Sequence, residues 1–211
     1  MTALLILGAG GHAKVLAETA LAQGCFSQIA FLDDQACQQT GDSTVLGWPV
    51  LGPLHRALEP AMLQSFSAAL VGIGDAAKRL HWLDQLGAIG YERPGLIHPT
   101  AWVSASASLG PGSVVFAQAT VQAQAHLGTG VILNTGCSID HDVHLADGVH
   151  ICPGARLAGE VDVGARSWIG IGACVIQQVR IGSDVIVGAG AAVVQDLADG
   201  VTAVGIPARS R

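Results

Sequence analysis

Hydrophobic residues recur every six positions across the second half of the chain. Counting in sixes from Ile97 meets an aliphatic residue every time: Ile97, Val103, Leu109, Val115, Val121, Leu127, Leu133, Ile139, Leu145, Ile151, Leu157, Val163, Ile169, Val175, Ile181, Val187 and Val193. A period of six fits neither a helix of 3.6 residues per turn nor a simple alternating strand. The pattern therefore predicts a solenoid of short strands separated by turns.

A second period of eighteen lies on top of the first. A small residue follows the aliphatic one at Gly110, Gly128, Ala146, Gly164 and Gly182, so three hexads form one coil and the solenoid has three faces. Small or β-branched residues also stand two positions before many of the aliphatic ones, where the backbone turns around a crowded interior. A purely structural or ice-binding solenoid is the alternative. The exposed positions carry histidines rather than the threonine ladders of a flat binding face.

The first third of the chain has a different pattern, typical of a small α/β domain. A buried strand at 4–7 runs into the loop Gly8-Ala9-Gly10-Gly11-His12-Ala13 and then into an apolar helix. This G-x-G-x-x-A spacing lets backbone and a helix N-terminus approach a phosphate. A second strand, 29–32, ends in Asp33-Asp34, where a Rossmann-type fold places an acidic residue against a ribose or base.

A third strand at 68–73 leads through Gly74-Asp75 into a helix at 76–86. Fewer than about 95 residues precede the hexads, which is enough for one mononucleotide-binding half of a dinucleotide fold. We therefore expect a nucleotide-sugar site here rather than an NAD site. The alternative is that the glycines serve only the turn from strand to helix.

Composition excludes several classes of function. The net charge is −6, only 12% of residues are charged, and there is no basic run that could bind nucleic acid. The N-terminal apolar stretch is too short to span a bilayer and lacks the basic flank of a signal peptide. The five cysteines form no C-x-x-C pair, so reduced thiols in the cytoplasm are expected.

Four histidines lie in the body of the solenoid, and one of them occupies a special position. His126, His144 and His150 directly precede an aliphatic residue and should point outward from flat faces. His141 instead follows Ile139 by two residues, which places it at a corner between Asp140 and Asp142. A neighbouring carboxylate fixes the tautomer of a histidine and supports its imidazolium, as a general base requires.

Eighteen residues after His141 stands Gly159, whose backbone N–H could face an oxyanion formed beside the base. A solvated surface histidine without a catalytic role is the alternative. A zinc hydratase is another alternative, but the histidine spacing of prism-shaped carbonic anhydrases is not reproduced, and we expect no metal.

The hexads resemble the left-handed parallel β-helix of the hexapeptide-repeat acyltransferases. The whole chain resembles the sugar O- and N-acyltransferases related to sialic acid O-acetyltransferases and to the UDP-4-amino-sugar N-acetyltransferases of the bacillosamine pathway. The resemblance rests on the stretches 8–12, 31–34, 72–75, 134–135 and 138–142 and on the Gly-Ile-Pro-Ala-Arg ending. It implies a Rossmann-like α/β domain at 1–94, followed by an all-β left-handed β-helix with a C-terminal cap at 95–211.

The resemblance also implies roles for individual residues. His141 would be the general base, oriented by Asp142. Acetyl-CoA would lie against Asn134, His150, Gly159, Ile171, Gly188 and Ala189. The nucleotide of the sugar substrate would lie against Gly10, Gly11, His12, Asp33, Asp34 and Gly74. Two positions depart from the bacillosamine enzymes, which often have Glu at the position of Asp142 and Asn at that of Asp75.

The implied reaction transfers acetyl from acetyl-CoA to the 4-amine of a nucleotide-linked 4-amino-4,6-dideoxy sugar, with UDP favoured as the nucleotide. O-acetylation of sialic acid or a related sugar is the first alternative, and a binding protein without catalytic activity is the second. No long loop interrupts the hexads to form a lid. We therefore expect a homotrimer with an active site between adjacent subunits.

Overall fold

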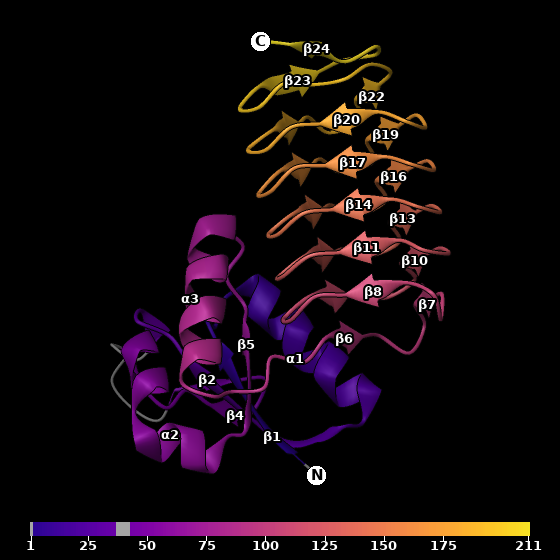
Figure 1. Cartoon of the computed structure of the whole chain (residues 1–211). Helices are drawn as coiled ribbons and strands as arrows, with labels where there is room; N and C mark the ends of the chain where they lie inside the picture. The colour runs from indigo at the N-terminus through magenta and orange to yellow at the C-terminus, as the bar shows by residue number, and fades with distance from the viewer. Residues whose placement is uncertain (1, 37–42) are drawn as a thin grey trace. The chain divides into compact units, whose positions relative to one another are not determined.

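The structure, a computed structural model, describes residues 2–36 and 43–211 and divides into two compact units. The units are Met1–Leu96 and Ile97–Arg211, a boundary two residues later than the sequence predicts. Figure 1 shows helices around a small sheet in the first unit and stacked coils of short strands in the second. The predicted fold class, an α/β domain followed by a parallel β-helix, is confirmed.

The N-terminal unit is built on a parallel sheet of three strands in the order β2 (Phe26–Leu32), β1 (Thr2–Leu7), β5 (Ala68–Val71). Helix α1 (Gly11–Gln23) follows β1, and α3 (Ala76–Ala88) follows β5. After β1 the chain adds β2 on one side of that strand, and it later adds β5 on the other side. The direction in which strands are added therefore reverses at β1. In open α/β sheets, ligands bind at such a switch point, outside the carboxyl ends of the strands.

Shorter elements that the sequence pattern does not predict connect β2 to β5. They are the hairpin of β3 (Thr44–Val45) and β4 (Trp48–Pro49), the 3₁₀ helix η2 (Leu54–Leu58) and α2 (Pro60–Ser65). Ala57 and Met62 from these helices pack with Leu5 and Leu7 of the central strand. The connection therefore completes the hydrophobic core on one side of the sheet.

The C-terminal unit consists of two-residue strands in three parallel sheets, which we name the β13, β14 and β15 faces. The β13 face contains β7 (Trp102–Val103), β10 (Thr120–Val121), β13 (Ser138–Ile139), β16 (Arg156–Leu157), β19 (Cys174–Val175) and β22 (Ala192–Val193). The β14 face contains β8 (Ser108–Leu109), β11 (His126–Leu127), β14 (His144–Leu145), β17 (Asp162–Val163) and β20 (Arg180–Ile181). The β15 face contains β6 (Leu96–Ile97), β9 (Val114–Val115), β12 (Ile132–Leu133), β15 (His150–Ile151), β18 (Trp168–Ile169), β21 (Ile186–Val187), β23 (Thr202–Val204) and β24 (Arg209–Ser210).

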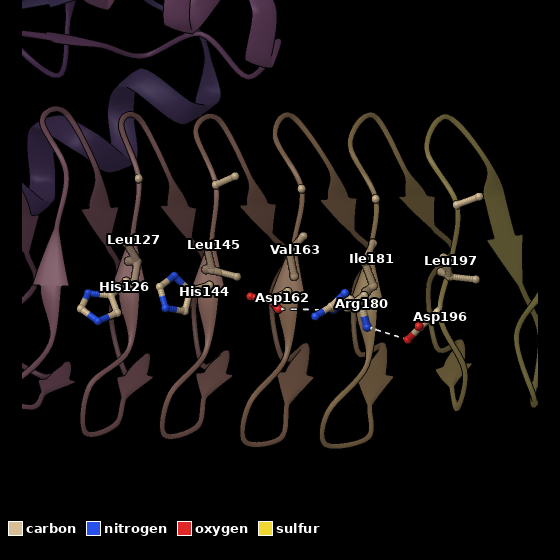
Figure 2. Close-up of a pocket in the computed structure, with 15 residues that line it drawn as sticks. His126, Leu127, His144, Leu145, Asp162, Val163, Arg180, Ile181, Asp196 and Leu197 are labelled. Carbon is tan, nitrogen blue, oxygen red and sulfur yellow. Dashed lines mark hydrogen bonds and ion pairs between the residues drawn. The ribbon is translucent and has the colours of Figure 1, made fainter.

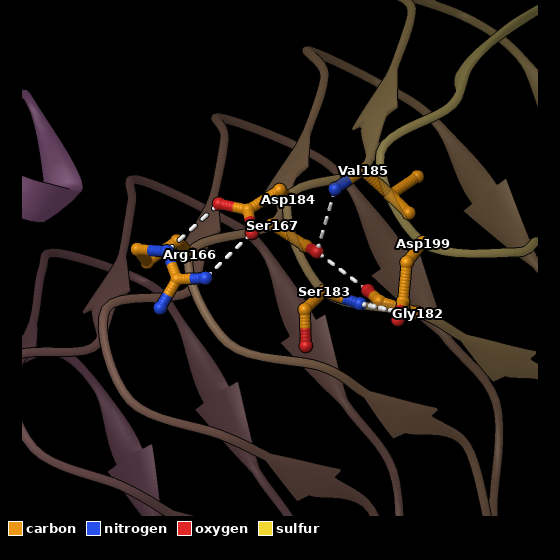
Figure 3. A network of polar contacts seen from close by, with 7 residues as sticks. All are labelled: Arg166, Ser167, Gly182, Ser183, Asp184, Val185 and Asp199. Atoms are coloured by element: carbon orange, nitrogen blue, oxygen red, sulfur yellow. Dashed lines mark hydrogen bonds and ion pairs between the residues drawn. The ribbon is translucent and has the colours of Figure 1, made fainter.

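Strands one coil apart pair in a register of eighteen residues, as in Val121 with Ile139 and Leu127 with Leu145. The aliphatic residue of each strand points inward, and these residues form one continuous core. Ser113 and Ser167 are buried polar side chains in this unit, and both are 0% exposed; Ser167 illustrates how they are accommodated. Its Oγ donates to the carbonyl of Gly182 (2.7 Å) and accepts from the N–H of Val185 (3.0 Å), so the buried hydroxyl is satisfied (Figure 3).

The glycines that recur every eighteen residues lie at the corner between the β14 and β15 faces. A Cβ on Gly182 would lie 2.2 Å from Oδ1 of Asp199, which accepts a hydrogen bond from the N–H of Ser183 (Figure 3). At the same corner Arg166 donates to Asp184 one coil further on, with 2.8 Å from Nε to Oδ1. The small residues therefore leave room for the turn of the next coil.

The hexad period breaks near the C-terminus, but the solenoid does not end there. Leu197 pairs with Ile181 sixteen residues earlier, and Ala203 pairs with Val187 at the same shortened spacing. The coil that ends at Leu197 is two residues shorter than the regular coil of eighteen, and Leu197 still lies inside the core. Strand β24 then returns antiparallel to β23, which covers the open edge of the β15 face.

Candidate active site

His141 and Asp142 form the turn between β13 and β14, at the corner that the hexad pattern predicts. Nδ1 of His141 lies 2.8 Å from Oδ2 of Asp142, and the His141 N–H donates to Oδ1 of Asp140. Both partners of the pair are about half exposed, at 54% and 51% of their side-chain surface. The imidazole is therefore held in one orientation but is open to a substrate.

This arrangement prepares His141 to accept a proton. The hydrogen bond to Asp142 is the main reason why the pKa of His141 is raised, and the charges of Asp140 and Glu160 raise it further. With the Nδ1 proton directed at the carboxylate, Nε2 carries the free lone pair. The ring can thus act as a general base through Nε2.

Gly159 lies one coil beyond His141 and packs directly against its ring. A Cβ at this position would lie 2.6 Å from both Cε1 and Nε2 of the imidazole. Within residues 2–36 and 43–211, the N–H of Gly159 has no hydrogen-bond acceptor. The missing side chain therefore leaves space for the imidazole of His141 and places an open backbone donor beside it.

On one side, this corner opens onto the β14 face. A depression of about 370 Å³ there is lined by Asp142, His144, Glu160, Asp162, Gln178 and Arg180. It continues into a groove of about 900 Å³ along the same face (Figure 2). The rings of His126 and His144 stack in this groove with their centroids 4.7 Å apart. No three His, Cys, Asp or Glu side chains in the described part of the chain are grouped to hold a metal ion.

A second group of expected residues lies at the corner between the β13 and β15 faces. Nδ2 of Asn134 lies 3.3 Å from Nε2 of His150, so the structure brings these two residues together. Trp168, which was not among the residues expected at this site, places its ring edge-on to His150 with centroids 6.3 Å apart. Trp168 follows His150 by eighteen residues, so the coil period could have identified it.

Ile171, Gly188 and Ala189 belong to the same corner, on coils nearer the C-terminus. Ile171 is 57% exposed and lies one coil from Ala189. His141 and Gly159 lie on the other edge of the β13 face. Within one chain, the expected catalytic residues and most of the expected acetyl-CoA residues therefore lie on opposite edges of the β13 face.

The glycines that follow β1 and β5 fall into two classes. Gly8 has a left-handed backbone (φ +100°) and packs against Gly72, and a Cβ on Gly72 would lie 2.6 Å from the Cβ of Ala13. These two glycines are required by the packing of the fold. By contrast, a Cβ on Gly10, Gly11 or Gly74 would meet no atom within 4 Å. Open space remains at those positions, at the carboxyl ends of β1 and β5.

The two aspartates after β2 hold loops in place. Oδ2 of Asp33 accepts from the N–H of Ala9 (2.9 Å), and its Oδ1 accepts from two backbone N–H groups of the turn that follows. Oδ1 of Asp34 accepts from the N–H of Leu54 (2.9 Å). A cavity of about 210 Å³ lies between Asp33 and Gly10. His12 is half-buried in the first turn of α1.

Asp75, which departs from the family pattern, caps α3. Its Oδ1 accepts from the N–H of Lys78 (2.8 Å), a bond that satisfies one of the free donors of the helix terminus. The charge of Asp75 also lies near the buried guanidinium of Arg79. Arg79 was not among the residues expected at this site.

Comparison with known proteins relates both units to sugar acetyltransferases. Residues 3–86 match the PglD N-terminal domain family. The chain is 39% identical over 118 residues to UDP-N-acetylbacillosamine N-acetyltransferase of Bacillus subtilis strain 168, a match to 56% of this chain. The chain spans about half (52%) of the length of that curated relative. Among the described residues, no helix is long and apolar enough to cross a membrane.

Solved structures match the entire chain. The acetyltransferase domain of PglB from Neisseria gonorrhoeae FA1090 is 43% identical with a TM-score of 0.94, covers 100% of both chains, and has also been solved with acetyl coenzyme A. PerB from Caulobacter crescentus, in complex with CoA and GDP-perosamine, is 39% identical with a TM-score of 0.89 and covers 100% of this chain and 98% of its own. Variants of that perosamine N-acetyltransferase replace one histidine by Ala or Asn. The chain belongs to the family of sugar N-acetyltransferases that includes the PglB acetyltransferase domain and PerB.

Proposed function

We propose that this protein transfers the acetyl group of acetyl-CoA to the 4-amine of a nucleotide-linked 4-amino-4,6-dideoxy sugar, with UDP as the favoured nucleotide. The observation that carries the proposal is the His141–Asp142 pair, whose imidazole packs against Gly159 one coil further on. The entire chain also aligns with two proteins that have been solved with acetyl coenzyme A or with CoA and GDP-perosamine. The Bacillus subtilis relative carries UDP in its name, which supports UDP.

In the proposed mechanism, Nε2 of His141 accepts a proton from the sugar amine while the amine nitrogen forms a bond to the thioester carbon. Asp142 stabilises the resulting imidazolium. The N–H of Gly159 donates to the oxyanion of the tetrahedral intermediate. His141 then returns its proton to the departing thiolate as the carbon–sulfur bond breaks, which leaves an acetamido sugar and free CoA. The reaction requires no covalent acyl-enzyme.

We assign acetyl-CoA to the corner formed by Asn134, His150, Ile171, Gly188 and Ala189, together with Gly159. Because His141 lies across a face from most of this group, we infer a homotrimer in which the His141 corner of one copy meets the Asn134 corner of the next. Exposed Trp168, Ile171 and Ile186 support this inference, since an interface would cover them. Light scattering should report a trimer, and a fully active monomer would contradict the assembly.

We assign the nucleotide sugar to Gly10, Gly11, His12, Asp33, Asp34 and Gly74. The open space at three of these glycines, beside the switch point of the sheet, supports the assignment. Gly74→Ala should leave thermal stability unchanged, because the added methyl meets no protein atom. It should weaken binding of UDP-sugars at least about tenfold in isothermal titration. Tight NAD(H) binding without any nucleotide-sugar binding would overturn the assignment.

A thiol-release assay with acetyl-CoA tests the reaction directly. UDP-, GDP- and dTDP-linked 4-amino sugars and free sialic acid would be compared as acceptors, and turnover only with sialic acid would favour O-acetylation. His141→Ala should lower turnover by about 10²- to 10⁴-fold, the usual range for a positioned base, while substrate binding survives. His126→Ala, another exposed histidine of the solenoid, is the matched control and should retain full turnover.

A further inference from the structure

Arg79 is a buried cation that holds a loop at the ligand-binding edge of the N-terminal sheet. It lies in the first turns of α3 and is only 1% exposed. Its Nη1 donates to the carbonyl oxygens of Ile73 (3.0 Å) and Gly74 (2.8 Å). Burial lowers the pKa of Arg79 to about 10, opposed by the charge of Asp75, so the guanidinium stays protonated at neutral pH.

These two hydrogen bonds fix the direction of the loop's peptide groups. In a trans peptide, the C=O and N–H point to opposite sides. Because the carbonyls of Ile73 and Gly74 face Arg79, the N–H groups of Gly74 and Asp75 face away from it. Neither N–H has an acceptor among the residues that the structure describes. Both residues are exposed, and the position of a Cβ on Gly74 is open.

The loop follows β5 at the switch point of the sheet, next to the glycine loop after β1. On its inner side Gly72 packs against Ala13 of α1, so the loop cannot shift inward. A pair of outward N–H groups above a buried positive charge favours an anionic oxygen. The opposite peptide orientation would present two carbonyl oxygens, which repel an anion.

We propose that Arg79 is a positioning residue for the nucleotide-sugar site: it turns the Gly74 and Asp75 N–H groups toward an oxygen of the diphosphate. The inference rests on the proposed function and deepens it. Arg79 itself does not touch the ligand. Its removal would free the carbonyls to rotate outward and would remove the positive charge beneath the loop.

Arg93 provides a matched control in the same unit. Its Nη1 also donates to a backbone carbonyl, that of Leu83 (3.2 Å). Its guanidinium packs over Gly87, in the last turns of α3 and away from the loop at 72–75. Replacing Arg93 therefore removes an arginine–carbonyl contact of the same kind without touching the proposed ligand loop.

Isothermal titration of Arg79→Gln, Arg79→Lys and Arg93→Gln with UDP, GDP and uridine tests the proposal. Arg79→Gln should weaken binding of the preferred diphosphate at least tenfold but change uridine binding less than twofold. Arg79→Lys keeps the charge and should lose less. Arg93→Gln should bind like wild type. In steady-state assays, Arg79→Gln should raise the KM for the nucleotide sugar and leave kcat and the KM for acetyl-CoA within twofold.

If wild-type protein binds no nucleoside diphosphate, the proposed nucleotide site is wrong, and so is the proposed role of Arg79. If wild type binds but folded Arg79→Gln binds equally well, or loses uridine affinity to the same degree, the positioning role is wrong and the proposed function stands. If Arg79→Gln does not fold, Arg79→Met decides, because methionine fills buried space but carries neither the charge nor the donors. Unchanged diphosphate affinity in that variant would overturn the proposal.

Discussion

Replacing Gly159 by alanine should misplace His141, the proposed general base, while leaving the fold intact. The new Cβ would lie 2.6 Å from Cε1 and Nε2 of His141, whereas ordinary contact begins at 3.4 Å. The ring must therefore withdraw by about 0.8 Å. It is the ring rather than the backbone that yields, since the imidazole is half exposed and can swing outward.

A displacement of this size has a large effect on a positioned proton transfer. Misplacing a reacting group by about 1 Å can lower the rate about a hundredfold, so we expect turnover to fall about ten- to a hundredfold. Gly159 does not have a left-handed backbone, and Gly→Ala at such sites restricts the unfolded chain. The free energy of unfolding should therefore change by less than about 1 kcal/mol.

A double-mutant cycle distinguishes displacement of the base from obstruction of acetyl-CoA. Turnover would be measured by thiol release for Gly159→Ala, His141→Ala and the double variant, all at saturating acetyl-CoA. If the methyl acts through the ring, it should have almost no further effect once His141 is absent. An equal loss from Gly159→Ala in both backgrounds would refute this reasoning and assign Gly159 to acetyl-CoA alone.

Further predictions concern the pH profile and the core. A general base must be neutral, so kcat/KM should fall as the pH drops through the raised pKa of His141, above its ordinary value of about 6.5. Asp142→Asn should shift this acid limb to lower pH and reduce turnover; an unmoved limb would contradict the pairing. In denaturant titrations, Ile139→Ala should cost about 2 to 5 kcal/mol. Ser167→Ala should cost about 1 to 3 kcal/mol by leaving buried backbone groups unpaired.

The solenoid was predictable from the sequence because each residue of a coil has a fixed place. Period six identifies the interior positions, and period eighteen stacks residues such as His141 and Gly159. The same arithmetic separates His141 from Ile171, which differ by thirty residues and so belong to different corners. The resemblance alone grouped them in one site, whereas the coil geometry places them on opposite edges of a face.

The N-terminal unit was less predictable because its contacts depend on tertiary packing. The strand pattern and the glycine spacing indicate the sheet and its loops. They do not show that Gly72 is required by packing against Ala13 while Gly74 faces open space. Arg79 follows a helix N-terminus, where arginine is ordinarily solvated, and no local pattern shows that its side chain turns back under the preceding loop.

The turn at His141 also shows why a shorter carboxylate suffices at position 142. Asp142 has a left-handed backbone (φ +57°), a conformation that aspartate tolerates better than most residues. Glu160, one coil further, has the same φ, and its carboxylate accepts from Gln178 on the next coil. The side chain of Asp142 instead reaches the adjacent ring at 2.8 Å. Because the bend of the backbone already places the carboxylate beside Nδ1, the additional methylene of glutamate is not needed to support the base.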